Sequence, residues 1–294
     1  MPELPEVETI ASELRRSLVG GRVTSVRVLW PRTIAQPEAA ILADLLPGRA
    51  FVSVSRRGKY LLLGLDSGDT LIVHLRMTGR LEILPGNSPA MSDKHVRAWF
   101  ELADERSLVF TDQRKFGRIW LVGDVAEVIG KLGPELLDWS FTPDDLAERV
   151  RPRRVAMKAL LLDQTAVAGL GNIYADESLF LAGIHPLRTG ASLTDEEIGR
   201  LHDAIRQVLG EAIGARGTTL RDYRPAYGVE GAYQNRLRVY GQPDQPCPHC
   251  GATIQRIRVA QRSTHFCPIC QPRAPGHPTS RRIRMPDPHR SIDS

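Results

Sequence analysis

The sequence predicts an α+β protein with more than one domain, because three kinds of pattern follow one another along its 294 residues. Short apolar runs typical of strands fill much of the first half, and helical patterns begin near residue 152. All 4 cysteines lie between positions 247 and 270. Strand runs without intervening helices favour a β-sandwich or barrel in the first half. A hydrophobic content of 42% at this length is sufficient for two domains with their own cores.

The first element that we expect is a helix running from about Pro5 to the glycine pair at 20–21. Proline suits the first turn of a helix, and Glu6 and Glu8 suit its positive end. Apolar residues then repeat at helical spacing: Val7, Ile10, Leu14 and Leu18. On this interpretation the chain begins with an ordinary helix start.

The residues ahead of that helix allow a second, chemical interpretation. If Met1 is removed, Pro2 becomes the chain terminus, and its secondary amine is a nucleophile with Glu3 beside it. An α-amino group titrates near pH 8, so roughly a tenth of it is neutral at pH 7. Its addition to an aldehydic carbon gives an iminium that withdraws electrons from the adjacent C–H and so favours elimination. The residues alone leave both interpretations open, and the two can coexist.

Five runs in the first half predict strands. Residues 60–65 and 70–75 flank one turn, residues 98–102 can pair with 107–111 across another, and 119–122 is a further short apolar run. Strands at this spacing pair with their neighbours in the chain. They therefore predict an N-terminal β-sandwich.

The second half changes to helical patterns. Residues 155–162 and 172–182 predict two helices, and Thr194 with Glu197 forms a capping box at the start of a third. A glycine turn at 168–172 joins the first two. Its backbone N–H groups open a helix and can hold a phosphate, although a plain helix connection uses glycine just as often.

The cysteines form two C-x-x-C pairs separated by a segment that can fold into a hairpin, and this spacing is typical of zinc sites. We therefore expect one structural Zn²⁺ held by Cys247, Cys250, Cys267 and Cys270. With all four positions filled by sulfur, the metal has no open site for water. Two disulfides or four free thiols are the alternatives, and His249 or His265 could replace a cysteine.

The formal net charge of +5 favours an anionic partner. Arginine and lysine form five clusters, near positions 56–59, 76–80, 114–118, 151–154 and 256–262. If folding gathers these clusters on one side, they make a phosphate-binding face. The residues alone thus indicate a basic zinc-hairpin protein that binds nucleic acid.

Read together, six segments resemble the bacterial formamidopyrimidine-DNA glycosylases of the MutM type, which are repair enzymes that excise oxidised purines. The segments occur in the family's order and run from residue 1 to the last cysteine: 1–9 (MPELPEVET), 57–60 (RGKY), 74–79 (HLRMTG), 111–117 (TDQRKFG), 169–177 (GLGNIYADE) and 261–270 (QRSTHFCPIC). The resemblance implies a β-sandwich, then a helix-two-turn-helix domain, then a zinc-finger hairpin, with damaged double-stranded DNA bound in the cleft between them.

On this basis we expect five segments in the chain. They are a catalytic β-sandwich domain at 1–131, a linker at 132–151, a DNA-binding helix-two-turn-helix domain at 152–237, a zinc finger at 238–272 and a disordered tail at 273–294. The chain shows no apolar run of the roughly 20 residues that a membrane span needs, and its first residues do not resemble a secretory signal. We expect a cytoplasmic monomer.

The resemblance also assigns roles to single residues. Pro2 matches the nucleophile, Glu3 the adjacent acid, Lys59 the lysine assigned to proton donation in β-elimination, and Arg262 the finger arginine associated with δ-elimination. The family's DNA contacts fall on His95, Arg114, Arg153 and Asn172, and its gap-filling side chains on Met77, Arg114 and Phe116. Arg151 or Arg154 could take the place of Arg153. Residues 221–233 match the loop that closes over the damaged base.

These assignments predict a bifunctional DNA glycosylase and abasic-site lyase that acts on oxidised purines such as 8-oxoguanine and formamidopyrimidines. The endonuclease VIII branch of the same superfamily, which prefers oxidised pyrimidines, is the nearest alternative, and Leu4 favours the purine branch. A zinc-hairpin protein that binds DNA without catalysis is the alternative from another class. The presence of Pro2, Glu3 and Lys59 argues against it.

Overall fold

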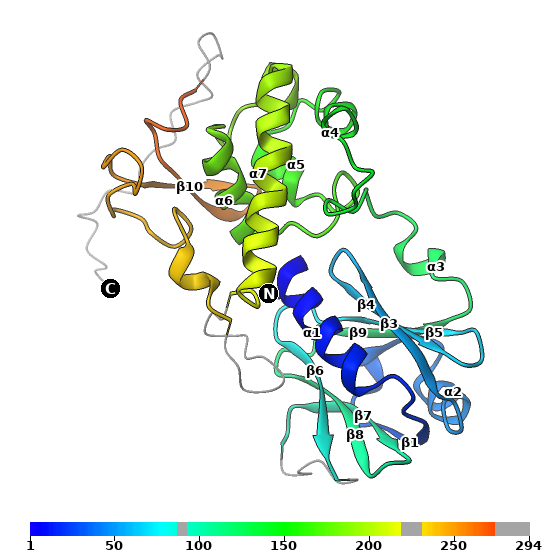
Figure 1. Cartoon of the computed structure of the whole chain (residues 1–294). Helices are drawn as coiled ribbons and strands as arrows, with labels where there is room; N and C mark the ends of the chain where they lie inside the picture. The colour runs from blue at the N-terminus through cyan, green and yellow to red at the C-terminus, as the bar shows by residue number, and fades with distance from the viewer. Residues whose placement is uncertain (87–92, 219–230, 274–294) are drawn as a thin grey trace, which may run out of the picture.

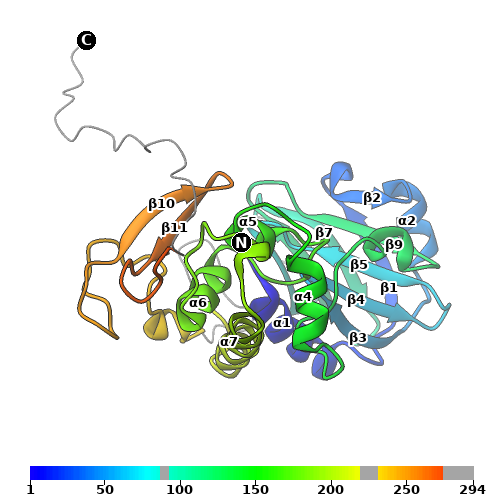
Figure 2. The same cartoon turned by 90° about the horizontal axis from the view of Figure 1, so that it is seen from above.

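The computed structural model describes residues 1–86, 93–218 and 231–273. These residues form a β-sandwich, a group of helices and a two-stranded hairpin (Figure 1). Seen from above, the helices stand between the sandwich and the hairpin (Figure 2). The α+β prediction is therefore confirmed.

Two sheets make up the sandwich. One has four strands in the order β1 (Val23–Val28), β7 (Val96–Leu102), β8 (Arg106–Asp112) and β6 (Gly79–Pro85). The other has five, in the order β2 (Ile34–Gln36), β9 (Arg118–Val122), β5 (Thr70–His74), β4 (Tyr60–Leu65) and β3 (Phe51–Arg57). Only β2 and β9 pair in parallel among these strands. Both predicted hairpins are present, with Leu61 opposite Val73 and Phe100 opposite Leu108.

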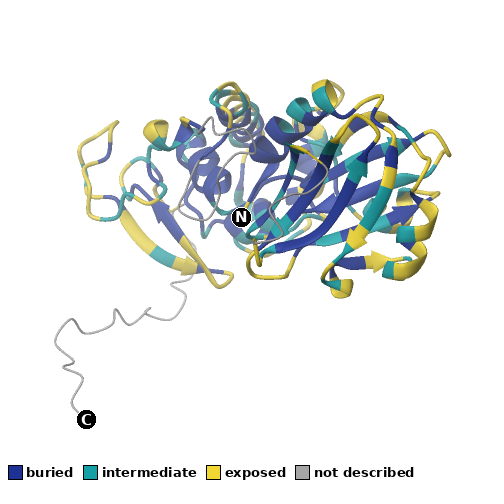
Figure 3. Ribbon diagram, turned by 90° about the horizontal axis from the view of Figure 1, so that it is seen from below, coloured by how far each residue is buried: buried dark blue, intermediate teal, exposed yellow. Residues whose placement is uncertain are grey.

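Alternation along the strands explains the sandwich core. Leu61, Leu63 and Leu65 of β4 are buried, whereas the residues between them are only half-buried. They pack with Phe100 and Phe110 of the opposite sheet in one apolar core. Buried positions run through the strands and the neighbouring helices, and exposed positions lie at the outer turns (Figure 3).

Helix α1 (Leu4–Ser17) links the two halves of the molecule. It begins at Leu4, one residue earlier than expected, and Val7, Ile10 and Leu14 belong to the sandwich core. Leu4 instead belongs to the core of the helical domain, and its backbone N–H donates to Gly169 O at 3.1 Å. The first turn of α1 is thus inserted between the domains, which places the start of the chain at their junction (Figure 1).

The predicted helices of the second half are present as α5 (Met157–Leu162), α6 (Asn172–Ala182) and α7 (Asp195–Gly214). Thr194 and Glu197 form the expected capping box of α7. The segment that we expected to be a linker contains α4 (Pro143–Val150), and Leu146 packs in the helical core. The remaining short elements are α2 (Ala39–Leu45), α3 (Ala126–Ile129) and the 3₁₀ turns Pro31–Thr33, Gly190–Ser192 and Tyr233–Arg236.

The hairpin consists of β10 (Gln255–Val259) and β11 (Arg262–Phe266), and it packs beside α6. A small apolar cluster joins Phe180 of α6 to Ile254, Cys247 and Cys267. In the three described ranges no helix has the length and apolar character needed to cross a membrane. Residues 274–294 of the expected tail, and 221–230 of the expected closing loop, lie outside the described residues.

Candidate active site

A cavity of about 790 Å³ lies where the sandwich, the helices and the hairpin meet. Its lining combines predicted site residues from all three parts: Glu3, Lys59, Met77, Phe116, Asn172 and Arg262. Met1 also lines this cavity and is 44% exposed, whereas Pro2 directly behind it is buried. Removal of Met1 would therefore leave the Pro2 amine at the cavity wall.

Glu3 is held by the start of helix α6. Its carboxylate accepts hydrogen bonds from Gly171 N at 2.7 Å and Ile173 N at 3.0 Å, and its side chain is buried. A Cβ on Gly171 would lie 2.3 Å from the carboxyl carbon of Glu3, so this close approach requires glycine. The sequence left open whether the glycine turn holds an anion. In the structure one N–H of this turn, that of Gly171, binds the carboxylate of Glu3 together with the N–H of Ile173 in α6.

Lys59 enters the cavity from the turn between β3 and β4. Its ammonium nitrogen donates to Leu170 O at 2.8 Å, and the residue is 5% exposed. Burial lowers the pKa of Lys59, and the nearby carboxyls of Glu3 and Glu6 oppose that shift. A lysine whose charged form is disfavoured in this way is better able to exchange a proton near neutral pH.

Glu6 lies behind Glu3, one turn into α1. It accepts hydrogen bonds from Glu3 N, Thr218 N and the Tyr174 hydroxyl. Burial, with the charge of Glu3 as a second cause, raises the pKa of Glu6 to about 7. The sequence explained Glu6 only as a favourable charge in the first helical turn, and its buried network was missed.

The hairpin supplies the far wall of the cavity. Arg262 is exposed at the start of β11 and lines the cavity. Asn172, the first residue of α6, donates from Nδ2 to Ser263 O at 3.0 Å. Its buried Oδ1 has no hydrogen-bond partner within the described part of the chain. Asn172 therefore ties the hairpin to α6 and still has an acceptor to offer.

Met77, Arg114 and Phe116 lie together at the sandwich edge of the cavity. The Arg114 guanidinium carbon lies 4.9 Å from the centre of the Phe116 ring, and its Nη1 lies 3.1 Å from Met77 Sδ. Phe116 is 49% exposed. An exposed aromatic ring beside an arginine and a methionine has the character of a wedge between base pairs.

Arg114 lies at the cavity edge without lining it, and two further predicted DNA contacts lie outside the cavity. His95 is half-buried beside the start of β7, and its backbone N–H donates to Asp93 at 2.8 Å. Arg153 forms an ion pair with Asp163, at 2.5 Å between Nη1 and Oδ2. Arg151, the neighbour that could have replaced it, pairs with Asp195 at the start of α7.

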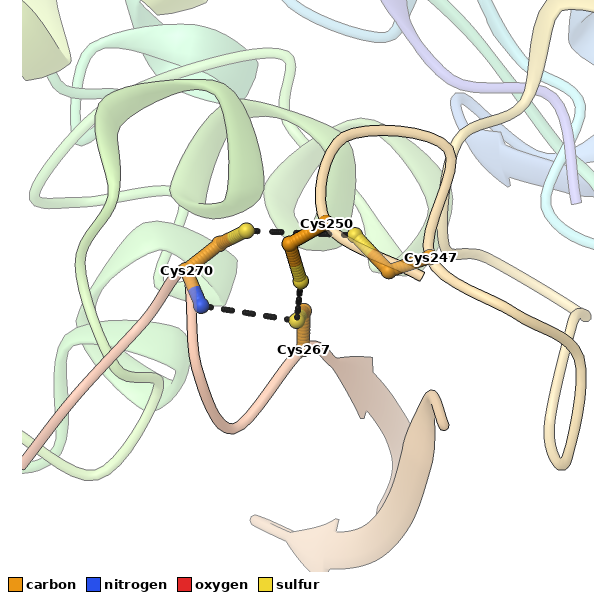
Figure 4. Close-up of side chains that lie close together, drawn as sticks. All are labelled: Cys247, Cys250, Cys267 and Cys270. Carbon is orange, nitrogen blue, oxygen red and sulfur yellow. Dashed lines mark hydrogen bonds between the residues drawn. The ribbon is translucent and has the colours of Figure 1, made fainter. Parts of the chain in front are cut away.

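The four cysteine sulfur atoms lie within 4.8 Å of one another (Figure 4). Sγ of Cys247 and Cys270 are 3.8 Å apart, and Sγ of Cys250 and Cys267 are 3.5 Å apart. Zinc–sulfur bonds of about 2.3 Å in a tetrahedron place sulfurs about 3.8 Å apart, whereas a disulfide needs about 2.05 Å. The cluster therefore fits one Zn²⁺, and the two-disulfide alternative is wrong.

Three family models match the chain. They are the formamidopyrimidine-DNA glycosylase N-terminal domain at residues 1–119, the formamidopyrimidine-DNA glycosylase H2TH domain at 132–224, and the zinc finger found in FPG and IleRS at 244–273. The formamidopyrimidine-DNA glycosylase of Chloroflexus aurantiacus is 50% identical over 275 residues, covering 92% of this chain and 98% of its own. The chain belongs to the formamidopyrimidine-DNA glycosylase family. The Herpetosiphon aurantiacus glycosylase is 48% identical over 274 residues, covering 92% of this chain and all of its own.

Solved structures of other glycosylases share this fold. A Lactococcus lactis FPG mutant in complex with DNA containing Fapy-dG is 39% identical, with a TM-score of 0.86, and covers 92% of this chain and 100% of its own. The L. lactis enzyme with DNA containing an abasic site gives the same values. MutM with DNA containing carbocyclic 8-oxo-G has a TM-score of 0.84 at 38% identity and the same coverage.

Arg76 and Arg118 also line the cavity of this glycosylase, and each comes from one of the basic clusters seen in the sequence. Three further lining residues had no individual role in the sequence interpretation: His74, Gln164 and Tyr240. Burial lowers the pKa of His74 to about 3, so its ring is neutral at physiological pH. No local pattern assigns these three to the cavity, because only the tertiary fold brings them together.

Proposed function

We propose that this formamidopyrimidine-DNA glycosylase excises oxidised purines, including 8-oxoguanine and formamidopyrimidines, from duplex DNA and cleaves the strand by β,δ-elimination. The observation that carries the proposal is the convergence of the chain start, Glu3 and Lys59 on one basic cavity. The related glycosylases bound to DNA containing Fapy-dG or carbocyclic 8-oxo-G support the lesion class. An abasic site in another complex supports the lyase step.

Base removal begins with the flipped nucleotide, because its C1′ is out of reach inside the duplex. The amine of Pro2, freed by loss of Met1, attacks C1′ and displaces the base. The proton that the Pro2 nitrogen loses on bonding to C1′ passes to the carboxylate of Glu3, and Glu3 delivers it to the sugar ring oxygen as the C1′–O bond opens. The product is an iminium between the Pro2 nitrogen and C1′.

Strand cleavage follows from the charge on that iminium. It acidifies the C2′ protons, so loss of one of them expels the 3′ phosphate by β-elimination, and a second elimination expels the 5′ phosphate. Both leaving groups are anions. Lys59 donates a proton in the first elimination, and Arg262 stabilises the charge that develops in the second.

The remaining predicted residues bind DNA in this proposal. Met77, Arg114 and Phe116 fill the gap left by the flipped base, since they already lie together at the cavity edge. Asn172 donates the second N–H of its Nδ2 to a phosphate. His95 and Arg153 contact the DNA backbone outside the cavity, and Arg153 would exchange Asp163 for a phosphate.

The four cysteines hold one structural Zn²⁺, which supplies no catalytic chemistry because sulfur fills its coordination sphere. It fixes the hairpin that carries Arg262. We also propose that the enzyme acts as a monomer on DNA in the bacterial cytoplasm. The segments expected from the sequence stand as a proposal for its domain boundaries, except that α4 is assigned to the helical domain and the linker is shortened to the residues before α4.

Single-turnover excision from matched duplexes tests the proposed lesion class. One duplex carries 8-oxoguanine and the other thymine glycol, and both product release and strand cleavage are followed. We expect faster excision of 8-oxoguanine, with both phosphates removed from the cleaved site. A preference for thymine glycol would assign the chain to the pyrimidine-type chemistry instead.

A further inference from the structure

Gln164, which lies in the turn after α5, uses its whole side-chain amide to hold the glycine turn. Its Oε1 accepts from Gly169 N at 3.0 Å. Its Nε2 donates to Leu170 O at 2.8 Å and to Leu162 O at 3.0 Å. One planar group therefore fixes both the N–H of Gly169 and the carbonyl of the next residue.

The Leu170 carbonyl is also the hydrogen-bond acceptor of Lys59. The nitrogens of Lys59 and Gln164 each lie 2.8 Å from this oxygen. Lysine carries a flexible four-carbon stem, so its nitrogen is placed only as well as the group that binds it. In the described residues, Leu170 O is the hydrogen-bond acceptor found for Lys59.

The same turn also touches the start of the chain. Gly169 O accepts from Leu4 N at 3.1 Å, and Gly171 N donates to Glu3 at 2.7 Å. Gly169 has a φ of +105°, a conformation that a side chain rarely tolerates, and its Cβ would lie 2.5 Å from Leu4 Cδ1. The turn is therefore held both by the chain start and by Gln164, which lines the cavity.

We propose that Gln164 is a positioning residue for strand cleavage: it holds the Leu170 carbonyl in place, and that carbonyl holds the amine of Lys59. The proposal rests on the role of Lys59 in β-elimination given above. Glu3 has two strong backbone donors of its own, and one of them, Ile173, belongs to α6 rather than to the turn. Loss of Gln164 should therefore disturb Lys59 more than Glu3.

The test compares two reactions of the zinc-loaded enzyme on duplex DNA that already contains an abasic site. Borohydride trapping measures iminium formation, and strand cleavage without borohydride measures elimination. In Gln164→Leu we expect cleavage to fall about tenfold while trapping stays within about twofold of the parent, since small misplacements of a reacting group are costly. Gln207→Leu is the matched control. Gln207 is exposed, and its side chain donates a hydrogen bond to Glu211 on the same helix, away from the cavity.

A second variant, Gln164→Glu, tests the position of the Lys59 amine by placing a negative charge near it. In Gln164→Glu one carboxylate oxygen can still accept from Gly169, and the other lies next to the shared carbonyl and hence near Lys59. A nearby carboxylate favours the charged ammonium. The pH profile of cleavage should therefore move to higher pH, a change that a purely structural role would not produce.

The variant Lys59→Ala distinguishes a wrong role for Lys59 from a wrong role for Gln164. If Lys59→Ala cleaves at the parental rate, the proposed role of Lys59 is wrong. If Lys59→Ala cleaves slowly while Gln164→Leu cleaves normally, only the role of Gln164 is wrong. The role of Gln164 is also wrong if Gln164→Leu loses trapping and cleavage equally and Gln164→Glu leaves the pH profile of cleavage unchanged.

Discussion

At the scale of single residues, two buried carboxyls near the start of the chain both bind the first turn of α6. Glu3 accepts from N–H groups at the start of α6, whereas Glu6 accepts from the Tyr174 hydroxyl and from the backbone N–H of Thr218. Thr218 lies three residues before the segment 221–233, which resembles the closing loop. The carboxyl of Glu6, whose pKa is raised, therefore lies where the chain start, α6 and Thr218 meet.

Glu6→Gln tests this environment through stability. The pKa of Glu6 is raised from 4.5 to about 7 in the folded enzyme, so the folded state binds more protons than the unfolded state in that window. Its contribution is therefore most favourable below pH 4.5 and is lost as the pH rises through about 7. Glutamine does not titrate.

The unfolding free energy of Glu6→Gln relative to the parent should consequently rise by about 2 kcal/mol from about pH 5 to about pH 8. Chemical denaturation of both proteins across this range measures the difference. The test uses the change of this free-energy difference with pH, because any pH-independent effect of the new amide on stability cancels. A pH-independent difference would show that Glu6 is ionised across the whole range.

The sequence could predict those site residues that belong to continuous motifs. Pro2, Glu3 and Lys59 lie in segments that resemble the family, and the cysteine spacing alone indicates zinc. The buried role of Glu6 could not be predicted, since Thr218 is 212 positions away in the chain. The bonds of Gln164 are local, but the carbonyl that it holds meets Lys59, 111 positions from Leu170, only in the folded chain. A glutamine in a turn and a glutamate in a first helical turn look ordinary until the fold is known.

At the scale of elements, sequence patterns predicted the strands that are apolar runs beside recognisable turns, and the three longer helical patterns of the second half. They missed β1, β2, β3 and β6, and α4 lay within the expected linker. Helix α4 begins with a proline after Thr142, which is a recognisable start. Its eight residues are too short for periodicity alone to distinguish a helix from a polar connection.

Zinc removal tests the hairpin as an element. Its own apolar cluster is small and includes two of the cysteines, so the metal must hold it together. A chelator should abolish DNA binding, measured by fluorescence anisotropy, and added zinc should restore it. Hydrogen exchange should show loss of protection in β10 and β11 with the sandwich strands unchanged. Parental affinity in protein shown by metal analysis to be free of zinc would refute this role.

At the scale of the whole molecule, the active site exists only because α1 is shared between two cores. Leu4 packs in the helical domain while Val7 packs in the sandwich. The cavity then collects cations from separate elements: Lys59, Arg76, Arg118 and Arg262. The sequence showed five basic clusters. Whether they face the same side depends on how the domains pack, and no single cluster indicates that.

Salt dependence tests the assembled basic surface. With four cationic residues in the cavity and Arg114 at its edge, the logarithm of the association constant should fall against the logarithm of salt concentration with a slope of about −4 or steeper. Arg262→Ala should make the slope shallower by about 1. Arg49→Ala is the control, since this exposed arginine lies outside the cavity. Binding that is independent of salt would contradict a phosphate-binding face.

The most direct test of the central claim is the identity of the residue that becomes attached to DNA. The enzyme is trapped with borohydride on a duplex containing 8-oxoguanine, digested with trypsin and nuclease, and analysed by mass spectrometry. We expect the sugar to be attached to the amine of Pro2, in a peptide that lacks Met1 and ends at Arg15. Attachment to Lys59, or efficient trapping by a chain that retains Met1, would contradict the role of Pro2 as nucleophile.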